Sequence, residues 1–167
     1  MTDGSKFVRK RQLLKVPTME EFQNYRGGHT HKKWVALPVE WRCPSCRRSR
    51  FEILTWTQTR MENGRVPTGE YKWLAPLHGH HDHGSHAGIP PRFAETIICG
   101  DCNSADGRAK RRLNRPADFS FSPLELSLFV IGTPHNGVRF ELEVAKKVYE
   151  SIAPLLPPIP PGAKRRW

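Results

Sequence analysis

The sequence has few cysteines and no long apolar run. Only four of its 167 residues are cysteine, and they form two C-x-x-C pairs. Because no apolar segment of the signal-peptide kind is present near the start, we expect reduced thiols that bind a metal ion. The expected location is the cytoplasm of a bacterial, archaeal or phage-infected cell. No run approaches the roughly 18 apolar residues of a membrane span, so no membrane partner is expected.

Acidic residues are also scarce. Asp and Glu number 16 against 27 Lys and Arg, which gives a formal net charge of +11. A basic excess of this size favours a polyanionic partner, because each phosphate that a protein neutralises releases counterions. The alternative is a generic basic surface, as in many ribosome-associated proteins. We therefore predict a nucleic-acid partner.

The order of the patterns predicts a small α+β protein that forms one compact domain, with 37% hydrophobic residues to supply its core. Its predicted segments are a basic arm with a short helix at 1–40, a core at 41–115, and a helical extension with a Pro-rich basic tail at 116–167. Strand patterns cover 51–59, 69–77 and 93–99, with a hairpin-turn signal at 62–64. Helical patterns begin after Thr18 and Ser122 and cover 103–113 and 140–155.

The cysteines predict a structural zinc site. Cys43 and Cys46 form one knuckle, and Cys99 and Cys102 form the second. Paired knuckles of this spacing are typical of tetrahedral zinc, and four thiolates leave no open position for water. A redox C-x-x-C is the alternative, but a redox pair needs no second copy. The ion is expected to hold the first knuckle against the start of the helix that follows the second.

A histidine-rich stretch precedes the second knuckle, with histidines at 78, 80, 81, 83 and 86. It could be a metal-scavenging surface tract. However, a strand that ends in adjacent histidines, then a short strand, then a helix beginning at Asn103 forms a ββα unit that places imidazoles opposite an amide oxygen. A cation with few protein ligands retains waters and accepts phosphate oxygens. A neutral imidazole nearby takes a proton from water near pH 7, so the set suits phosphodiester hydrolysis.

These residues resemble a known family. The run His80-His81-Asp82-His83, followed by Cys99-x-x-Cys102-Asn103-x-x-Asp106-Gly107, is similar to the HNH, or ββα-metal, nucleases. The nearest type is the zinc-bearing group that includes phage recombination endonuclease VII and related restriction nucleases. The resemblance covers residues 41–113. It implies a small ββα-metal nuclease core stabilised by a four-cysteine zinc site with flanking helices, and an endonuclease that hydrolyses DNA with a divalent cation.

The resemblance also implies roles for single residues. By position in the motif, His81 is the expected general base, and His80 and Asn103 are the expected ligands of the catalytic cation. His83 and Asp106 are expected to orient the base or to contact the scissile phosphate. The family's usual cation is Mg²⁺, with Mn²⁺ in some members. Because His80 stands where the endonuclease VII group has Asp, the preference is expected to move toward Mn²⁺, Ni²⁺, Co²⁺ or Zn²⁺.

Strand geometry leaves open which histidines form the site. In a straight strand His80 and His81 point to opposite faces, whereas His81 and His83 share one. His80 and His81 converge only if the strand bends or ends there, which Gly79 and Gly84 would permit. In a straight strand, His81 and His83 would form the site and His80 would support it.

The helix after the second knuckle is the predicted DNA-binding element, with basic residues Arg108, Lys110, Arg111, Arg112 and Arg115. The alternative function is a non-catalytic zinc-ribbon module that binds DNA or RNA. Restriction, homing, junction-resolving and nicking roles all fit the endonuclease. A double-strand cut from a single ββα site would require a homodimer, whereas a nick would not.

Overall fold

The computed structural model describes residues 14–60, 67–84, 90–115 and 118–156. The helices are α1 (Met19–Asn24), α2 (His31–Ala36), α3 (Gly100–Arg112), α4 (Pro123–Ser127) and α5 (Leu142–Ile152), with short 3-10 turns at Gly28–Thr30 and Ala153–Leu155. The strands are β1 (Thr55–Arg60), β2 (Pro67–Leu74), β3 (Leu77–His80), β4 (Thr96–Cys99), β5 (Val130–Thr133) and β6 (Gly137–Phe140). Within these ranges, no helix has the length and apolarity needed to cross a bilayer.

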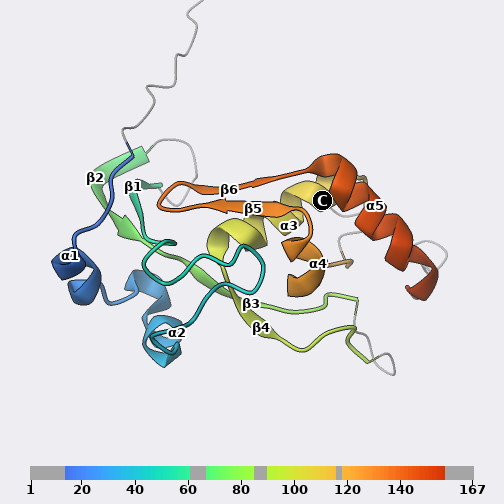
Figure 1. The fold of residues 1–167 in the computed structure, drawn as a ribbon, viewed down its shortest axis with the longest axis horizontal. Coiled ribbons are helices and arrows are strands. Elements are labelled where there is room, and N and C mark those ends of the chain that lie inside the picture. Colours follow the sequence, from blue (N-terminus) through green and yellow to red (C-terminus); the bar gives the residue numbers. More distant parts are fainter. Residues whose placement is uncertain (1–13, 61–66, 85–89, 116–117, 157–167) are drawn as a thin grey trace, which may run out of the picture.

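The strands form three separate two-stranded antiparallel sheets, β1–β2, β3–β4 and β5–β6. Figure 1 shows α3 in the middle of the molecule beside the β5–β6 hairpin. Helices α1 and α2 and the β1–β2 hairpin lie toward one end, and α4 and α5 lie toward the other. The protein is therefore of the mixed α+β class with small sheets, as the sequence predicts.

Helix α3 begins earlier than predicted. The sequence predicted a helix that begins at Asn103, but the helix starts at Gly100 and Asn103 lies in its first turn. The backbone N–H of Gly100 donates to the Pro76 carbonyl at 2.7 Å. A Cβ at position 100 would come 2.7 Å from the Pro76 ring, so only glycine fits this start. The long-range contact with Pro76, which no local pattern reveals, therefore sets the helix boundary.

Other predicted boundaries also change. Residues 31–36, where no helix of their own was predicted, form α2, which buried Trp34 anchors. Gly27 has a φ of 86°, and a Cβ at this position would come 2.4 Å from Trp34 Cβ, so a side chain there would collide. The strand predicted at 51–59 begins at Thr55, and the one predicted at 69–77 divides between β2 and β3. The predicted turn at 62–64 lies outside the described residues.

The predicted helix starts at Thr18 and Ser122 are confirmed. Each hydroxyl accepts a hydrogen bond from the backbone of the glutamate three residues later, and each glutamate side chain accepts one from the capping residue's N–H. These reciprocal bonds satisfy two backbone donors that a helix start otherwise leaves free. They explain how helices as short as α1 and α4 have defined beginnings.

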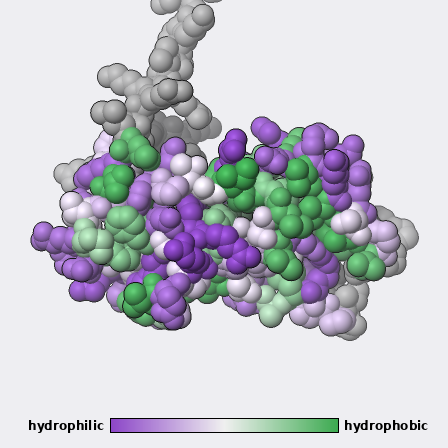
Figure 2. Space-filling view, in the orientation of Figure 1, coloured by the Kyte–Doolittle hydropathy of each residue, from purple (hydrophilic) through white to green (hydrophobic). Residues whose placement is uncertain are grey.

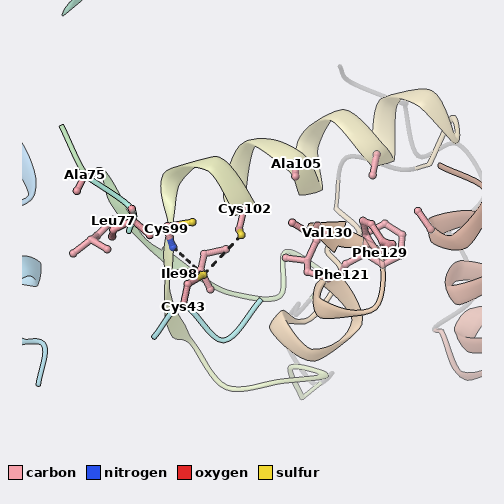
Figure 3. Packing of buried hydrophobic residues seen from close by; sticks show 14 of the residues in the cluster. Cys43, Ala75, Leu77, Ile98, Cys99, Cys102, Ala105, Phe121, Phe129 and Val130 are labelled. Atoms are coloured by element: carbon pink, nitrogen blue, oxygen red, sulfur yellow. Dashed lines mark hydrogen bonds between the residues drawn. The ribbon is translucent and has the colours of Figure 1, made fainter. Parts of the chain in front are cut away.

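One buried cluster joins residues from Trp34 to Val148. Helix α3 turns Cys102, Ala105 and Ala109 inward, and aromatic residues of the following segment pack beside them (Figure 3). On the face in Figure 2, hydrophobic residues gather over α4 and α5, where Leu124 and Leu128 are exposed, and hydrophilic residues cover the centre. The small side chains on α3 let it lie close to its neighbours, so its position is tightly defined.

Candidate zinc centre and histidine site

The four cysteines form one compact cluster. Their sulfur atoms all lie within 4.8 Å of one another, with Cys43 to Cys102 and Cys46 to Cys99 both at 3.8 Å. A zinc ion with Zn–S bonds of about 2.3 Å in a tetrahedron holds its sulfurs about 3.8 Å apart. Figure 3 shows Cys43 facing the first turn of α3, which supplies Cys102. The predicted cluster is confirmed, and its spacing fits a bound zinc ion.

Arg48, which the sequence analysis did not single out, contacts this cluster. Its guanidinium donates to the sulfurs of Cys46 and Cys99 at 3.3 and 3.5 Å and pairs with Asp101 at 2.7 Å. Burial opposes its charge, but Asp101 and the sulfurs outweigh burial and raise the pKa of Arg48. Hydrogen bonds from the neighbouring thiols, Cys102 first, and from Arg48 lower the pKa of the Cys46 thiol. Hydrogen bonds with Cys43 and Cys46 raise the pKa of Cys102, so a bound metal ion would be needed to hold all four cysteines as thiolates.

The β3–β4 hairpin leads directly into α3. Leu77 pairs with Cys99 and His80 with Thr96, so β3 ends at His80 while β4 runs into the second knuckle. The cluster holds the first turn of α3 beside this hairpin. As a result, His80 Nδ1 lies 3.4 Å from the amide oxygen of Asn103. The structure brings together the two residues predicted as ligands of a catalytic cation.

His80 is buried, with 3% of its surface exposed. Its Nε2 lies 2.7 Å from the backbone oxygen of Phe121, and its ring stacks on Phe93 with centroids 5.5 Å apart. A carbonyl oxygen only accepts hydrogen bonds, so Nε2 carries the hydrogen. In the neutral ring Nδ1 then has a free lone pair that faces the Asn103 oxygen. Phe121 lies 41 residues along the chain and contributes a backbone atom, so no sequence motif indicates it.

His81 and His83 lie at the surface after the end of β3, with ring centroids 4.6 Å apart. The Nδ1–H of His81 donates to the Gly79 carbonyl at 3.3 Å, so Nε2 is its basic atom. His80 is buried and His81 is exposed, so the two imidazoles point to opposite sides and do not converge. The straight-strand arrangement is the one observed, with His81 beside His83, while His80 lies separately beside Asn103. The fifth histidine of the stretch, His86, lies outside the described residues.

Asp82, between these two histidines, fixes the turn that carries them. Only 5% of it is exposed, and its carboxylate accepts from the backbone N–H groups of Gly84 and Arg92 at 3.2 and 2.9 Å. Sequence reasoning placed Asp82 in the family motif without assigning it a role. Its inward carboxylate holds the neighbouring imidazoles outward, because adjacent residues point in opposite directions here.

Asp106 is buried and binds inside the protein. Its carboxylate accepts from the Phe121 N–H at 3.1 Å and pairs with Lys110 at 2.9 Å. The Lys110 ammonium also donates to the Phe119 carbonyl at 2.7 Å. Asp106 thus holds the residue whose carbonyl orients His80, which favours a positioning role over phosphate contact. Lys110 faces inward, so we leave it out of the DNA-binding surface predicted for α3.

The remaining predicted DNA-binding residues lie on or near the surface. Arg108, Arg111 and Arg112 are exposed, and Arg108 and Arg112 lie over the Phe140 ring at 5.4 and 5.6 Å. Arg115 is partly buried and stacks on Tyr149 at 4.0 Å. Aromatic contacts thus hold Arg108, Arg112 and Arg115 in place.

Comparison of the chain with protein-family models, with curated proteins and with solved structures finds no match.

Proposed function

We propose that the protein is a divalent-metal-dependent DNA endonuclease of the HNH, or ββα-metal, type, near the zinc-bearing endonuclease VII group. The observation that carries the proposal is the facing pair of acceptor atoms, His80 Nδ1 and Asn103 Oδ1, 3.4 Å apart. Two acceptors repel each other unless a proton or a cation lies between them. The Phe121 carbonyl already accepts a hydrogen bond from Nε2–H, which is the one N–H of a neutral His80 ring, so a cation is favoured between Nδ1 and the Asn103 oxygen.

The spacing of these two atoms fits a shared cation. An ion about 2.1 Å from each ligand holds them about 3.0 Å apart in an octahedron and about 3.4 Å apart in a tetrahedron. The Nε2–H bond from His80 to the Phe121 carbonyl matches the outer hydrogen bond that orients most metal-binding histidines. Two protein ligands leave positions for water and for phosphate oxygens. His80 and Asn103 would therefore hold the ion, which would stabilise negative charge on the phosphate during hydrolysis.

His81 is the proposed general base. Its Nδ1–H is bound to Gly79, so Nε2 takes a proton from a water molecule that attacks the phosphorus atom. Its exposure admits a phosphodiester of duplex DNA. The ring of His83 contacts the ring of His81 and serves to orient it. A neutral imidazole stabilises protonated His81 less than a carboxylate would. The zinc centre takes no part in the reaction and holds the hairpin against α3.

The test is nicking of supercoiled plasmid by the zinc-loaded protein. We expect nicking with Mn²⁺ or Mg²⁺ and none with EDTA at unchanged zinc content. His81→Ala is expected to cut about 10²–10⁴-fold more slowly, because it removes the general base. His78→Ala is the matched control, since His78 belongs to the same histidine stretch and is exposed at the start of β3, and it should cut normally. A His81→Ala protein that cuts at the wild-type rate would remove this mechanism.

A non-catalytic zinc-ribbon module is the second candidate, because the four-cysteine cluster and the basic charge alone would serve it. It predicts binding to DNA or RNA without cutting in any divalent metal. The same plasmid assay, run across a metal series beside a binding measurement, separates the two.

A further inference from the structure

A polar groove of about 690 Å³ lies between α3 and the β5–β6 hairpin. We call it the α3–β6 groove. Its lining includes Asn103, Ser104, Gly107, Arg108, Arg111 and Asn136. Asn103 belongs both to this groove and to the candidate cation site, so a strand bound at that site has a direct path into the groove.

The groove is positively charged. Arg108 and Arg111 are exposed, and neither forms an ion pair within the described ranges. Asp101, a carboxylate that lines the groove, is paired with Arg48 at 2.7 Å. Guanidinium groups bind phosphate oxygens through two parallel hydrogen bonds. The groove therefore presents uncompensated charge that is suited to phosphodiesters.

Gly107 lines an open part of the groove, and the fold itself does not require a glycine at this position. It lies in the interior of α3, where glycine is less stable than alanine. Its φ is not in the left-handed region, and the nearest atom to an added Cβ is the flexible end of Arg111 at 3.4 Å. Neither backbone conformation nor packing accounts for glycine here. The missing side chain leaves room beside the Arg111 guanidinium for another molecule's backbone to approach the helix.

The opposite wall is rigid. His135, in the β5–β6 turn, is buried; its N–H donates to the Glu52 carbonyl at 2.8 Å, and its Nδ1 lies 2.9 Å from the Leu54 carbonyl. Asn136 follows it directly and is exposed at the groove. The turn is thereby fixed to the chain just after the first zinc knuckle. The backbone that carries Asn136 is therefore held in place before any ligand binds, which lowers the entropy lost on binding.

We propose that the α3–β6 groove binds backbone phosphates of the DNA strand that flank the bond to be cut; this rests on the proposed function. From Asn103 to Arg111 the helix advances about 12 Å, which is the axial rise of roughly three to four nucleotides of one B-DNA strand. Arg108 and Arg111 contact these phosphates, and the Asn136 amide donates from the other wall. The groove fixes the register of the strand without reading its sequence.

The test measures how the affinity of the zinc-loaded protein for duplex DNA depends on salt concentration. Fluorescence anisotropy is the readout, and divalent cations are left out of the buffer. Arg111→Gln is expected to lower the slope of log affinity against log salt by about 0.9, the value for one lost phosphate contact. Arg139→Gln is the matched control. Arg139 is exposed and follows Val138, which lines the groove, so it lies on the other face of β6. Equal slopes for Arg111→Gln and the wild type would overturn the proposal.

Gly107→Ala fills the open part of the groove at residue 107 without changing the charge of the protein. It should melt at or above the wild-type temperature, bind DNA more weakly, and keep the wild-type salt slope. Wild-type affinity in this variant would show that nothing approaches Gly107. Plasmid nicking separates the two proposals: nicking with an unaltered Arg111→Gln slope rejects the groove alone, whereas a lowered slope without nicking rejects the nuclease alone.

Discussion

His80 lies between two oxygen atoms that make different demands on its ring. The Phe121 carbonyl requires a hydrogen on Nε2, and the Asn103 oxygen faces Nδ1 at 3.4 Å. One side chain thus links the hairpin, the first turn of α3 and the segment after α3. The endonuclease VII group, which the sequence resembles, has aspartate at this position. His80 would therefore set the metal preference of the proposed site, since an imidazole is a softer ligand than a carboxylate and carries no charge.

We expect a metal preference that follows from this ligand. Plasmid nicking by the wild type should be faster in Mn²⁺, Co²⁺ or Ni²⁺ than in Mg²⁺, because imidazole nitrogen favours these ions. In His80→Asp the ratio of the Mg²⁺ rate to the Mn²⁺ rate should rise, even where both rates fall. A ratio that does not change would mean that residue 80 does not touch the cation.

Arg48 gives a second prediction for a single residue. Arg48→Gln removes the guanidinium that donates hydrogen bonds to the sulfurs of Cys46 and Cys99. Zinc affinity should fall about 10–100-fold, as for other losses of outer contacts to metal ligands. Competition with a chromogenic chelator measures it, and Arg47→Gln, on the exposed neighbour, is the control. Equal zinc affinity in both variants would contradict the role of Arg48.

Helix α3 is held near both ends. Its first turn belongs to the cysteine cluster, and its later turns hold residues 119–121 through Asp106 and Lys110. The Phe121 N–H donates to Asp106, and the Phe121 carbonyl accepts from His80. The attachment of α3 to Phe121 therefore also sets the position of His80. The element that supplies Asn103 therefore also orients His80.

Asp106→Ala tests this attachment. It leaves the Lys110 ammonium buried without its carboxylate, so the free energy of unfolding should fall by about 3–5 kcal/mol. Denaturant unfolding of the zinc-loaded protein measures the loss. The double variant Asp106→Ala with Lys110→Met should lose less, since no charge is then stranded. An equal loss in both would assign the effect to the Phe121 hydrogen bond alone.

Local sequence patterns predicted which helices and strands form better than they predicted where each one begins and ends. The capped starts at Thr18 and Ser122 follow from residues three apart, so the sequence reveals them. The start of α3 depends on Pro76, and α2 depends on burial of Trp34, neither of which a local window contains. The cysteine cluster was predictable because its spacing is a property of the metal. The Phe121 carbonyl was not, because a backbone atom carries no sequence signal.

For the molecule as a whole, the cysteine cluster joins segments far apart in the chain. It connects the turn at residues 43–46 to the start of α3 and forms part of the single buried cluster. The sheets are only two strands each and cannot form independently stable layers. An ion held by this cluster would therefore supply much of the stability of the fold, since its binding free energy would add to the free energy of folding.

Zinc removal tests this dependence. Cys99→Ala, or a strong chelator on the wild type, should abolish cooperative thermal unfolding, because the hairpin and α3 lose their connection. Circular dichroism with zinc analysis measures it, and re-addition of zinc should restore the wild type alone. Unchanged melting of Cys99→Ala would show that the cluster is not a structural centre.

The most direct test of the proposed site is paramagnetic broadening of side-chain NMR signals during a Mn²⁺ titration of the zinc-loaded protein. We expect the signals of His80 and Asn103 to broaden first, and we expect His80→Ala to remove the effect while the fold persists. Broadening confined to the exposed His81 and His83, or none at any histidine, would contradict it.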